Sequence, residues 1–492
     1  MPLQEDLCMR SSEENRERTD QIVKGDKGGP SLPARSSTVS RIGCLAVIIA
    51  VLVCAEVIAR QCFDSAHYAD HYKRDIRRIE STGSDVGMVV AGASQVYHGC
   101  DTSVLASEMG YEEVLDASTA SQSTDGAYYM VEYLLSHFSP EYVVVNLNWD
   151  RLFPKKQVNL HRGRLLVGDY ISETEKIKYF LDCAPVGQWF NLSYLYRFGG
   201  TVTGISQLKE NYENRKKTAD PGWTADTSMS SYYGGNGFIV FKDNAPYGSM
   251  NAEKLTFSEE KIAGHEVEYT LKIAELCRKK GIKLIWITIP TTLAELYSVD
   301  DYQAAVDYLT SFCAQTGYPY INFSMLKNRE ELFPDTVFSD HIHLSLDGAE
   351  RFSKLLADTI RKVEAGEDIS GMFYDSFEEL KKDVHRIPGC FVYVKRKRTG
   401  DYKVKALSVQ NDGLIPEYRL LLKQDSGEWE LLSDWQESPD FVIAQDAMTP
   451  EDELRIETRR KGEMEYDCFW ELNVQHALDK KTSAFDGDEE NS

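Results

Sequence analysis

One apolar segment stands out near the amino terminus: from Ile42 to Ala59 only Glu56 carries a charge. As an α-helix this segment would be about 27 Å long, which is enough to cross a thin bilayer. A cleaved signal peptide fits poorly, because 41 residues precede the segment and no small-residue cleavage site ends it. A buried core helix is the other alternative, but the polar flanks favour a membrane span. We therefore expect a transmembrane helix at residues 42–59, after a disordered polar tail at residues 1–41.

The charges around this helix do not indicate its orientation in the membrane, and the charge of the whole chain argues against a nucleic-acid role. Lys and Arg number four in the 20 residues before it and five in the 20 residues after it, so the positive-inside rule states no preference. The whole chain has 55 Lys and Arg against 78 Asp and Glu, and its net charge of −23 argues against binding to nucleic-acid phosphates. Residues 60–84 are charged and helical in pattern, which predicts a helical stalk.

Between residues 85 and 365, short apolar runs alternate with segments in which apolar residues recur every three or four positions. The runs that predict strands are Val86–Ala91, Glu113–Leu115, Tyr142–Leu147, Ile282–Ile289 and Tyr318–Asn322. The segments that predict helices are Asp125–His137, Ser258–Lys280, Asp300–Gln315 and Asp347–Lys362. Continuous apolar strands are expected where helices cover both faces of a parallel sheet. The pattern predicts a three-layer α/β domain at residues 85–365, with an insertion at residues 150–257.

Seven short strand-like runs separated by turn residues follow this domain. They are Cys390–Arg398, Lys403–Ser408, Glu417–Leu422, Trp429–Leu432, Phe441–Ala444, Glu453–Glu457 and Cys468–Val474. This pattern predicts an antiparallel β-sandwich at residues 388–476, joined by a linker helix at residues 366–387 and followed by an acidic tail at residues 477–492. Cys390 and Cys468, on the first and last runs, can form a disulfide or remain two buried thiols.

A serine and an Asp-x-x-His pair are the candidate catalytic residues. Ser94 follows the first predicted strand in a Gly92-Ala93-Ser94 turn, where residues point into the ligand crevice of an open α/β fold. Such a turn alone is a weak signal, because Gly and Ser are common turn residues. Asp340 and His343 strengthen it, since a serine nucleophile needs a base that a third group orients.

With these residues in this order, residues 85–365 resemble the SGNH (GDSL-like) hydrolase superfamily. Its members place a serine in a Gly-x-Ser turn after the first strand and an Asp-x-x-His near the carboxyl end. The resemblance implies a three-layer flavodoxin-like domain with a parallel sheet. It also implies that Ser94 is the nucleophile, His343 the general base and Asp340 its orienting partner. The reaction of such a triad needs no cofactor.

The family's oxyanion hole depends on two further sequence blocks, and both are altered in this chain. Ser118 stands where the family has a glycine that donates its backbone N–H. In the second block, normally Gly-x-Asn, Asn146 takes the glycine place and Asn148 keeps the donor amide. The resemblance implies an oxyanion held by the N–H groups of Ser94 and Ser118 and by the side chain of Asn148. A left-handed backbone at Ser118 would cost about 1–2 kcal/mol.

The order of anchor, stalk and SGNH-like domain is similar to that of membrane-bound proteins that transfer D-alanyl or acetyl groups on bacterial envelope polymers. This similarity implies a single-pass protein of the cell membrane whose catalytic domain is extracytoplasmic. The implied function is that of an esterase or acyltransferase for an O-acyl group, acetyl or D-alanyl, on a cell-envelope glycopolymer. The alternative is a non-catalytic scaffold in envelope polysaccharide assembly, with assembly proteins as partners. In either case the β-sandwich would be an accessory that binds glycan or a partner.

Other residues near these motifs have competing interpretations. Arg151, Lys155 and Arg162 belong to a basic strip that can steer an anionic polymer or can simply be solvated loop charges. A further alternative is a metal-dependent hydrolase in which Asp340, His341 and His343 are the ligands, although we predict no metal site. His98 can flank the pocket or lie on a helix surface. Cys100 is a rival nucleophile that we expect to face helix packing.

Overall fold

The computed structural model describes residues 38–63, 68–153, 157–218, 220, 222–244, 255–409, 413–424 and 427–479. Most of the two predicted tails, residues 1–37 and 480–492, therefore lies outside the described residues. Among the residues described, one helix is long and apolar enough to cross a membrane, namely α1 (Thr38–Cys62). Its apolar stretch runs from Ile42 to Cys62, three residues past the predicted end.

A five-stranded parallel sheet lies at the centre of the α/β domain. Its strands are β1 (Val86–Gly92), β2 (Glu113–Ser118), β3 (Tyr142–Asn146), β7 (Lys283–Thr288) and β9 (Tyr320–Asn322). They are arranged in the order β2-β1-β3-β7-β9, and every neighbouring pair is parallel. This is the strand order of flavodoxin-like doubly wound sheets, in which ligands bind beside the first strand where the order reverses. All of the predicted strands are confirmed.

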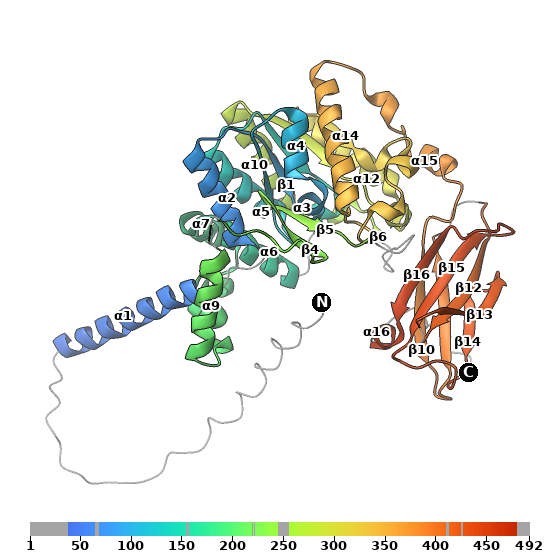
Figure 1. The fold of residues 1–492 in the computed structure, drawn as a ribbon. Helices are drawn as coiled ribbons and strands as arrows, with labels where there is room; N and C mark the ends of the chain where they lie inside the picture. Colours follow the sequence, from blue (N-terminus) through green and yellow to red (C-terminus); the bar gives the residue numbers. More distant parts are fainter. Residues whose placement is uncertain are drawn as a thin grey trace, which may run out of the picture. The chain divides into compact units, whose positions relative to one another are not determined.

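Helices cover both faces of this sheet, as Figure 1 shows. Along β1, Val89 and Ala91 belong to one hydrophobic core, whereas Met88 and Val90 belong to another. The helices of the first core are α5 (Thr124–His137), α10 (Gly264–Lys280) and α12 (Tyr302–Thr316). Those of the second are α3 (Ser94–Gly99), α4 (Thr102–Met109) and α14 (Leu346–Glu364). The predicted three layers are therefore present.

The predicted stalk is part of the folded domain instead. Helix α2 (Ala69–Thr82) lies within residues 60–84, but its Tyr72, Ile76 and Ile79 are buried in the first core. These side chains recur at helical spacing, so they form one apolar face that packing against the sheet layer keeps from water. The sequence pattern showed the helix correctly but did not show what covers that face.

The insertion at residues 150–257 is partly helical and carries a β-hairpin. Its elements begin with η1 (Trp149–Leu152), α6 (Gln157–Tyr170), α7 (Glu173–Cys183), η2 (Val186–Leu192), α8 (Tyr194–Phe198), η3 (Gly199–Thr201) and α9 (Ile205–Thr218). They end with β4 (Ser231–Gly235), β5 (Phe238–Phe241) and β6 (Leu255–Thr256), which pairs with β8 (Val299–Asp300). Further short helices in the α/β domain are α11 (Leu293–Tyr297) and α13 (Arg329–Leu332).

The β4–β5 hairpin is attached to the edge strand β2 and to α2. The backbone N–H of Asp116 donates to the carbonyl of Asn236 at 2.9 Å. From α2, Asp75 accepts hydrogen bonds from the Tyr233 hydroxyl at 2.7 Å and from the Asn236 N–H at 2.9 Å. Gly237 has a φ of 96°, and a Cβ there would lie 2.7 Å from the Asp116 carbonyl oxygen, so the close approach requires glycine.

The carboxyl-terminal segment forms two antiparallel sheets around one core. The first contains β10 (Cys390–Arg396), β11 (Tyr402–Ser408) and β14 (Asp440–Ile443). The second contains β12 (Pro416–Lys423), β13 (Trp429–Gln436), β15 (Glu453–Arg460) and β16 (Cys468–Asn473), and α16 (Val474–Asp479) follows. Side chains from both sheets share one hydrophobic core, which is the packing of a β-sandwich. All seven predicted runs are strands, and Cys390 and Cys468 are free thiols.

Residues 366–387, predicted as a linker helix, contain a helix of seven residues, α15 (Phe377–Asp383), preceded by the single turn η7 (Ser370–Met372). Phe377 and Leu380 of α15 are buried in the first core of the α/β domain. The helix is therefore shorter than predicted, and its apolar side packs on the domain that precedes it.

We expect Tyr233→Phe to lower the free energy of unfolding by about 1–3 kcal/mol, because it removes a buried hydroxyl that donates to Asp75 and accepts from the Gly237 N–H at 3.0 Å. Urea denaturation of the full chain in detergent measures this effect. Tyr466→Phe, at an exposed tyrosine, serves as the control and should change the value little. Equal stability of Tyr233→Phe and wild type would show that the hairpin is not held by this bond.

Candidate active site

The candidate nucleophile lies where the strand order of the sheet reverses. Ser94 is the first residue of α3, directly after β1, and its side chain is half-buried. The predicted oxyanion residues Ser118 and Asn148 follow the same edge, since β2 ends at Ser118 and β3 ends two residues before Asn148. Because parallel strands end on one edge of their sheet, the topology gathers these three residues at the edge where such folds bind ligands.

Asp340 and His343 form the predicted pair. The Nδ1 atom of His343 lies 2.6 Å from Asp340 Oδ2, and Asp340 Oδ1 accepts the backbone N–H groups of Ile342 and His343 at 2.8 Å each. Burial alone would raise the pKa of Asp340, but the hydrogen bond and charge of His343 lower it to about 2. An ionised carboxylate can only accept, so Nδ1 carries the proton. The Nε2 atom then has its lone pair available, and it is buried with no hydrogen-bond partner among the described residues.

His98 connects this pair to the serine helix. It lies one helical turn after Ser94 on α3, and its ring centre is 5.3 Å from that of His343. His98 Nδ1 lies 2.7 Å from the carbonyl oxygen of Ile239 on β5, so Nδ1 is the protonated nitrogen. Burial and the neighbouring His343 lower the pKa of His98 to about 3, which keeps its ring neutral.

Phe241, at the end of β5, completes this contact. Its ring stacks on His98 at 3.5 Å and meets the edge of the His343 ring at 6.1 Å. The insertion hairpin thus contacts both α3 and the loop that carries Asp340. The interpretation of His98 as a helix-surface residue is wrong, because its side chain is buried against Phe241 and His343. No spacing in the sequence pointed to Phe241.

The two oxyanion blocks differ in how their side chains are used. Ser118 pairs with Gly92 in the sheet, and the positive φ in this block falls on Ser121, at 56°, rather than on Ser118. Asn146 is bonded at both ends of its amide: it donates to Gln95 Oε1 at 3.1 Å and accepts the Ile289 N–H at 3.0 Å. Asn146 therefore ties β3 to α3 and to the end of β7.

The side chain of Asn148 is bonded only through its oxygen among the described residues. Its Oδ1 accepts the Trp149 N–H at 2.9 Å, which orients the side chain and leaves the donor end without a bond to another described residue. The oxyanion role of Asn148 stays a prediction. The strain predicted for Ser118 does not arise, because its backbone is part of a strand.

The predicted basic strip is not a continuous surface. Arg151 is 8% exposed, and its guanidinium donates to the carbonyl of Gln122, so it holds the loop after β2 rather than facing solvent. Arg162 is exposed on α6, and Lys155 lies outside the described residues. For Arg151, both interpretations, a residue that steers an anionic substrate and a solvated loop charge, are therefore wrong, because the tertiary fold buries a side chain that the sequence showed only as basic.

A buried carboxyl group that sequence reasoning missed lies beside the pair. Glu295, on α11, has one oxygen 4.0 Å from His341 Nε2 and buried without a hydrogen-bond partner among the described residues. Burial, with the charges of Asp150 and Asp340, raises the pKa of Glu295 to about 8. Nothing in its local sequence signals this environment. Cys100, in contrast, is buried in the second core as expected.

A metal site has weak support in the described part of the chain. One group there has three ligand atoms within 4.8 Å of one another, and it consists of Asp125, Cys183 and His265 rather than Asp340, His341 and His343. Asp125 already lies 3.5 Å from the guanidinium of Arg164 and 3.1 Å from His265 Nε2. A cation would have to compete with that arginine, so these residues fit a hydrogen-bonded charge cluster better than a metal centre.

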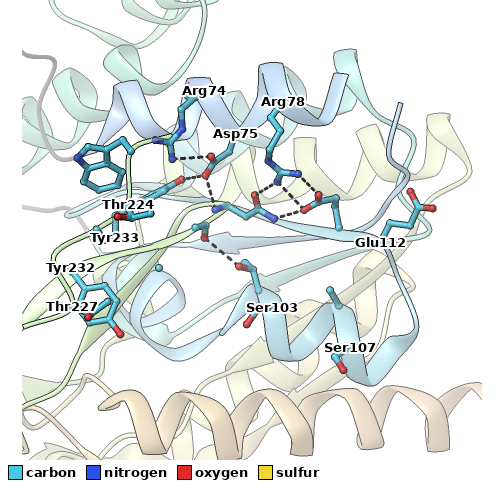
Figure 2. A pocket seen from close by; sticks show the side chains of 18 of the residues that line it. Arg74, Asp75, Arg78, Ser103, Ser107, Glu112, Thr224, Thr227, Tyr232 and Tyr233 are labelled. Carbon is cyan, nitrogen blue, oxygen red and sulfur yellow. Dashed lines mark hydrogen bonds and ion pairs between the residues drawn. The ribbon is translucent and has the colours of Figure 1, made fainter. Parts of the chain in front are cut away.

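A separate groove of about 720 Å³ lies between α2, α4 and the hairpin strand β4. Figure 2 shows Arg74 and Arg78 extending toward it from α2, and Ser103 and Ser107 on the helix opposite. Its charges are paired, since Arg74 lies 3.2 Å from Asp75 and Arg78 lies 2.5 Å from Glu113. The groove therefore offers no excess positive charge for an anion.

Hydroxyl groups and aromatic rings supply much of the rest of the groove's lining, beside Glu112 and Asn236. They belong to Thr102, Ser103, Ser107, Tyr111, Trp223, Thr224, Thr227, Tyr232 and Tyr233. In addition, Arg74 Nη1 is buried with no hydrogen-bond partner among the described residues. The groove thus combines flat apolar rings with many neutral hydrogen-bonding groups.

Comparison with known proteins adds no assignment. No known protein-family model matches the chain, and no curated protein matches it. The chemistry of the site therefore has to be judged from its own residues.

We expect Glu295→Gln to make the stability of the protein less dependent on pH. An unfolded glutamate has a pKa of about 4.3, whereas folded Glu295 has a pKa of about 8. Between these values the unfolded chain releases a proton that the folded chain keeps, so the free energy of unfolding of wild type falls as the pH rises. Urea denaturation at pH 4.5, 6.5 and 8.5 should show a smaller fall in the variant. An identical pH profile in both proteins would contradict the buried, protonated state of Glu295.

Proposed function

We propose that this protein is a membrane-anchored SGNH-type serine esterase or acyltransferase. Its substrate would be an O-acyl group, acetyl or D-alanyl, on a cell-envelope glycopolymer. The observation that carries the proposal is the Asp340–His343 pair: His343 Nε2 has no hydrogen-bond partner among the described residues, Ser94 included, and the His343 ring contacts His98 on the helix that begins with Ser94. The flavodoxin-like strand order and the Gly-x-Ser turn support it independently.

The residues account for each step of an acyl transfer. His343 Nε2 takes the proton of the Ser94 hydroxyl as its oxygen attacks the acyl carbonyl carbon. The N–H groups of Ser94 and Ser118 and the amide of Asn148 stabilise the oxyanion. When the C–O bond to the leaving sugar breaks, His343 returns the proton to that oxygen. Water or a sugar hydroxyl then attacks the acyl-serine ester, again deprotonated by His343, and Ser94 leaves with the proton.

A fluorophosphonate probe tests whether Ser94 is an activated nucleophile. We expect wild type to be labelled at Ser94 and Ser94→Ala to remain unlabelled. Asp340→Asn should slow labelling by about 10³–10⁴-fold, because the imidazole loses its orienting carboxylate. Ser81→Ala, at an exposed serine of α2, is the control and should react like wild type. The measurement is the rate of adduct formation followed by mass spectrometry.

A folded wild-type protein that takes no label at Ser94 would contradict the enzyme proposal. It would favour the alternative, a non-catalytic SGNH-like scaffold that binds glycan or an assembly protein. Circular dichroism and thermal unfolding of each variant separate lost reactivity from lost folding.

The groove beside β4 is the best candidate for holding the polymer. Sugars offer apolar C–H faces to aromatic rings and hydroxyl groups to neutral polar side chains, and this groove presents both. The same hairpin contributes Ile239 and Phe241 to the His98–His343 contact. A glycan bound along β4 would therefore lie on the element that also borders the proposed triad.

We expect Trp223→Ala to weaken glycan binding by roughly tenfold, through loss of an aromatic contact in the groove. Binding is measured by calorimetry with soluble acetylated and D-alanylated envelope-glycan fragments, in a Ser94→Ala background so that no turnover occurs. Tyr318→Ala, at a half-buried tyrosine beside β9, should leave affinity unchanged. Unchanged affinity in Trp223→Ala would exclude the groove as the glycan site.

The remaining parts of the chain have supporting roles in this proposal. Helix α1 would anchor the protein to the cell membrane as a single span, with the catalytic domain on the extracytoplasmic side. The β-sandwich at residues 388–476 would be the accessory that binds glycan or an envelope-assembly partner.

A further inference from the structure

The last turn of α1 is held by the insertion rather than projecting freely. Arg60 forms an ion pair with Glu173 at 2.5 Å and donates to the carbonyl of Leu192 at 3.5 Å. Its guanidinium also lies 5.3 Å from the centre of the Tyr194 ring. Arg60 is the first basic residue after the apolar run, so in a spanning helix it marks the membrane boundary.

The chain just after α1 is attached to the same helices. Phe63 stacks on Phe198 of α8 at 5.1 Å. From α9, Arg215 donates to the carbonyl of Phe63 at 2.9 Å and forms an ion pair with Asp70 at 2.8 Å. Helices α8 and α9 therefore lie at the point where the apolar helix ends.

Large apolar side chains are exposed around this point. Val186, Phe190, Tyr196 and Ile205 are 63–86% exposed, and we call them the 186–205 surface. Phe190 and Tyr196 touch each other with ring centres 5.8 Å apart. They lie two residues before Leu192 and two residues after Tyr194, which both contact Arg60. In a water-soluble protein so much exposed apolar surface in one segment calls for a covering partner.

The charge pattern of this segment identifies that partner. Residues 184–208 contain no Asp or Glu, and Arg197 is their only charged residue, although the whole chain has a net charge of −23. Five aromatic residues fall between positions 189 and 198. Helix α9, which follows, is mixed in charge, with exposed Lys209, Glu210, Glu213, Lys216 and Lys217. Aromatic and aliphatic side chains without acids, next to the end of the apolar helix α1, match the interfacial layer of a bilayer.

We propose that the 186–205 surface is immersed in the interfacial layer of the membrane beside the α1 anchor. This second contact would hold the α/β domain against the bilayer, in place of a flexible stalk. The inference rests on the proposed membrane anchoring by α1, but not on the proposed chemistry of Ser94.

Site-specific protection from a charged maleimide tests this contact. The full chain is placed, one copy per particle, in lipid nanodiscs of phosphatidylethanolamine and phosphatidylglycerol, which leave both membrane faces open to the reagent. Tyr196→Cys is compared with Val442→Cys, because both positions are 63% exposed and Val442 lies in the β-sandwich. Native Cys54, exposed on α1, reports on the anchor in the same sample. Labelling of each cysteine is read by peptide mass spectrometry.

We expect Cys54 to be unreactive and Tyr196→Cys to react at least tenfold more slowly than Val442→Cys. Phe190→Cys, as a second position, should be protected like Tyr196→Cys. If Cys54 is protected while both insertion positions react as fast as Val442→Cys, the membrane contact is overturned and the anchor stands. Protection of those positions only in native membranes would assign the surface to a protein partner and also overturn the proposal. A reactive Cys54 would instead refute the anchor itself, and with it this inference.

Discussion

The attachment of the β4–β5 hairpin to the edge of the parallel sheet positions residues of both the groove and the candidate active site. An edge strand has unpaired backbone groups that need a partner, and here Asn236 accepts the N–H of Asp116 on β2. Asp75 of α2 holds the same hairpin through the Tyr233 hydroxyl. On β5, the carbonyl of Ile239 accepts a hydrogen bond from His98, and the ring of Phe241 contacts that of His343. One insertion therefore contacts the edge strand of the sheet, forms a wall of the groove and borders the candidate active site. A long insertion is compatible with the fold because it adds to an edge rather than interrupting the layers.

The electrostatics of the site depend on burial as much as on charge. Asp340 remains ionised because His343 and two backbone N–H groups stabilise its negative form, whereas Glu295 nearby has no such donors and its pKa rises. Neutral His98 contributes shape and packing without placing a positive charge beside the base. The two carboxyl groups of this region, Asp340 and Glu295, thus differ in protonation at neutral pH, because their surroundings shift their pKa values in opposite directions.

The insertion also relates the catalytic proposal to the membrane proposal. Its first half, α7 to α9, holds Arg60 and Phe63 at the end of α1, and its second half forms the hairpin that borders the triad. This arrangement would help an enzyme that acts on a membrane-associated polymer, because binding of the 186–205 surface to the membrane would fix the distance between the active site and its substrate. The insertion, rather than the parallel sheet, is what such a role would require.

The sequence by itself determined the element types, since apolar periodicity depends only on local spacing: the strands of both sheet systems, the main helices and the apolar α1 are all visible in it. It also indicated the Asp340–His343 pair, whose members are close enough along the chain for one loop to join them. Tertiary structure alone decided the rest. Arg151 became buried, α2 became a core helix, and distant segments brought Phe241 to His343, Ile239 to His98 and Glu295 to His341. The physical reason is that burial and long-range contact depend on which surfaces pack together, and no local pattern in a single sequence records that choice.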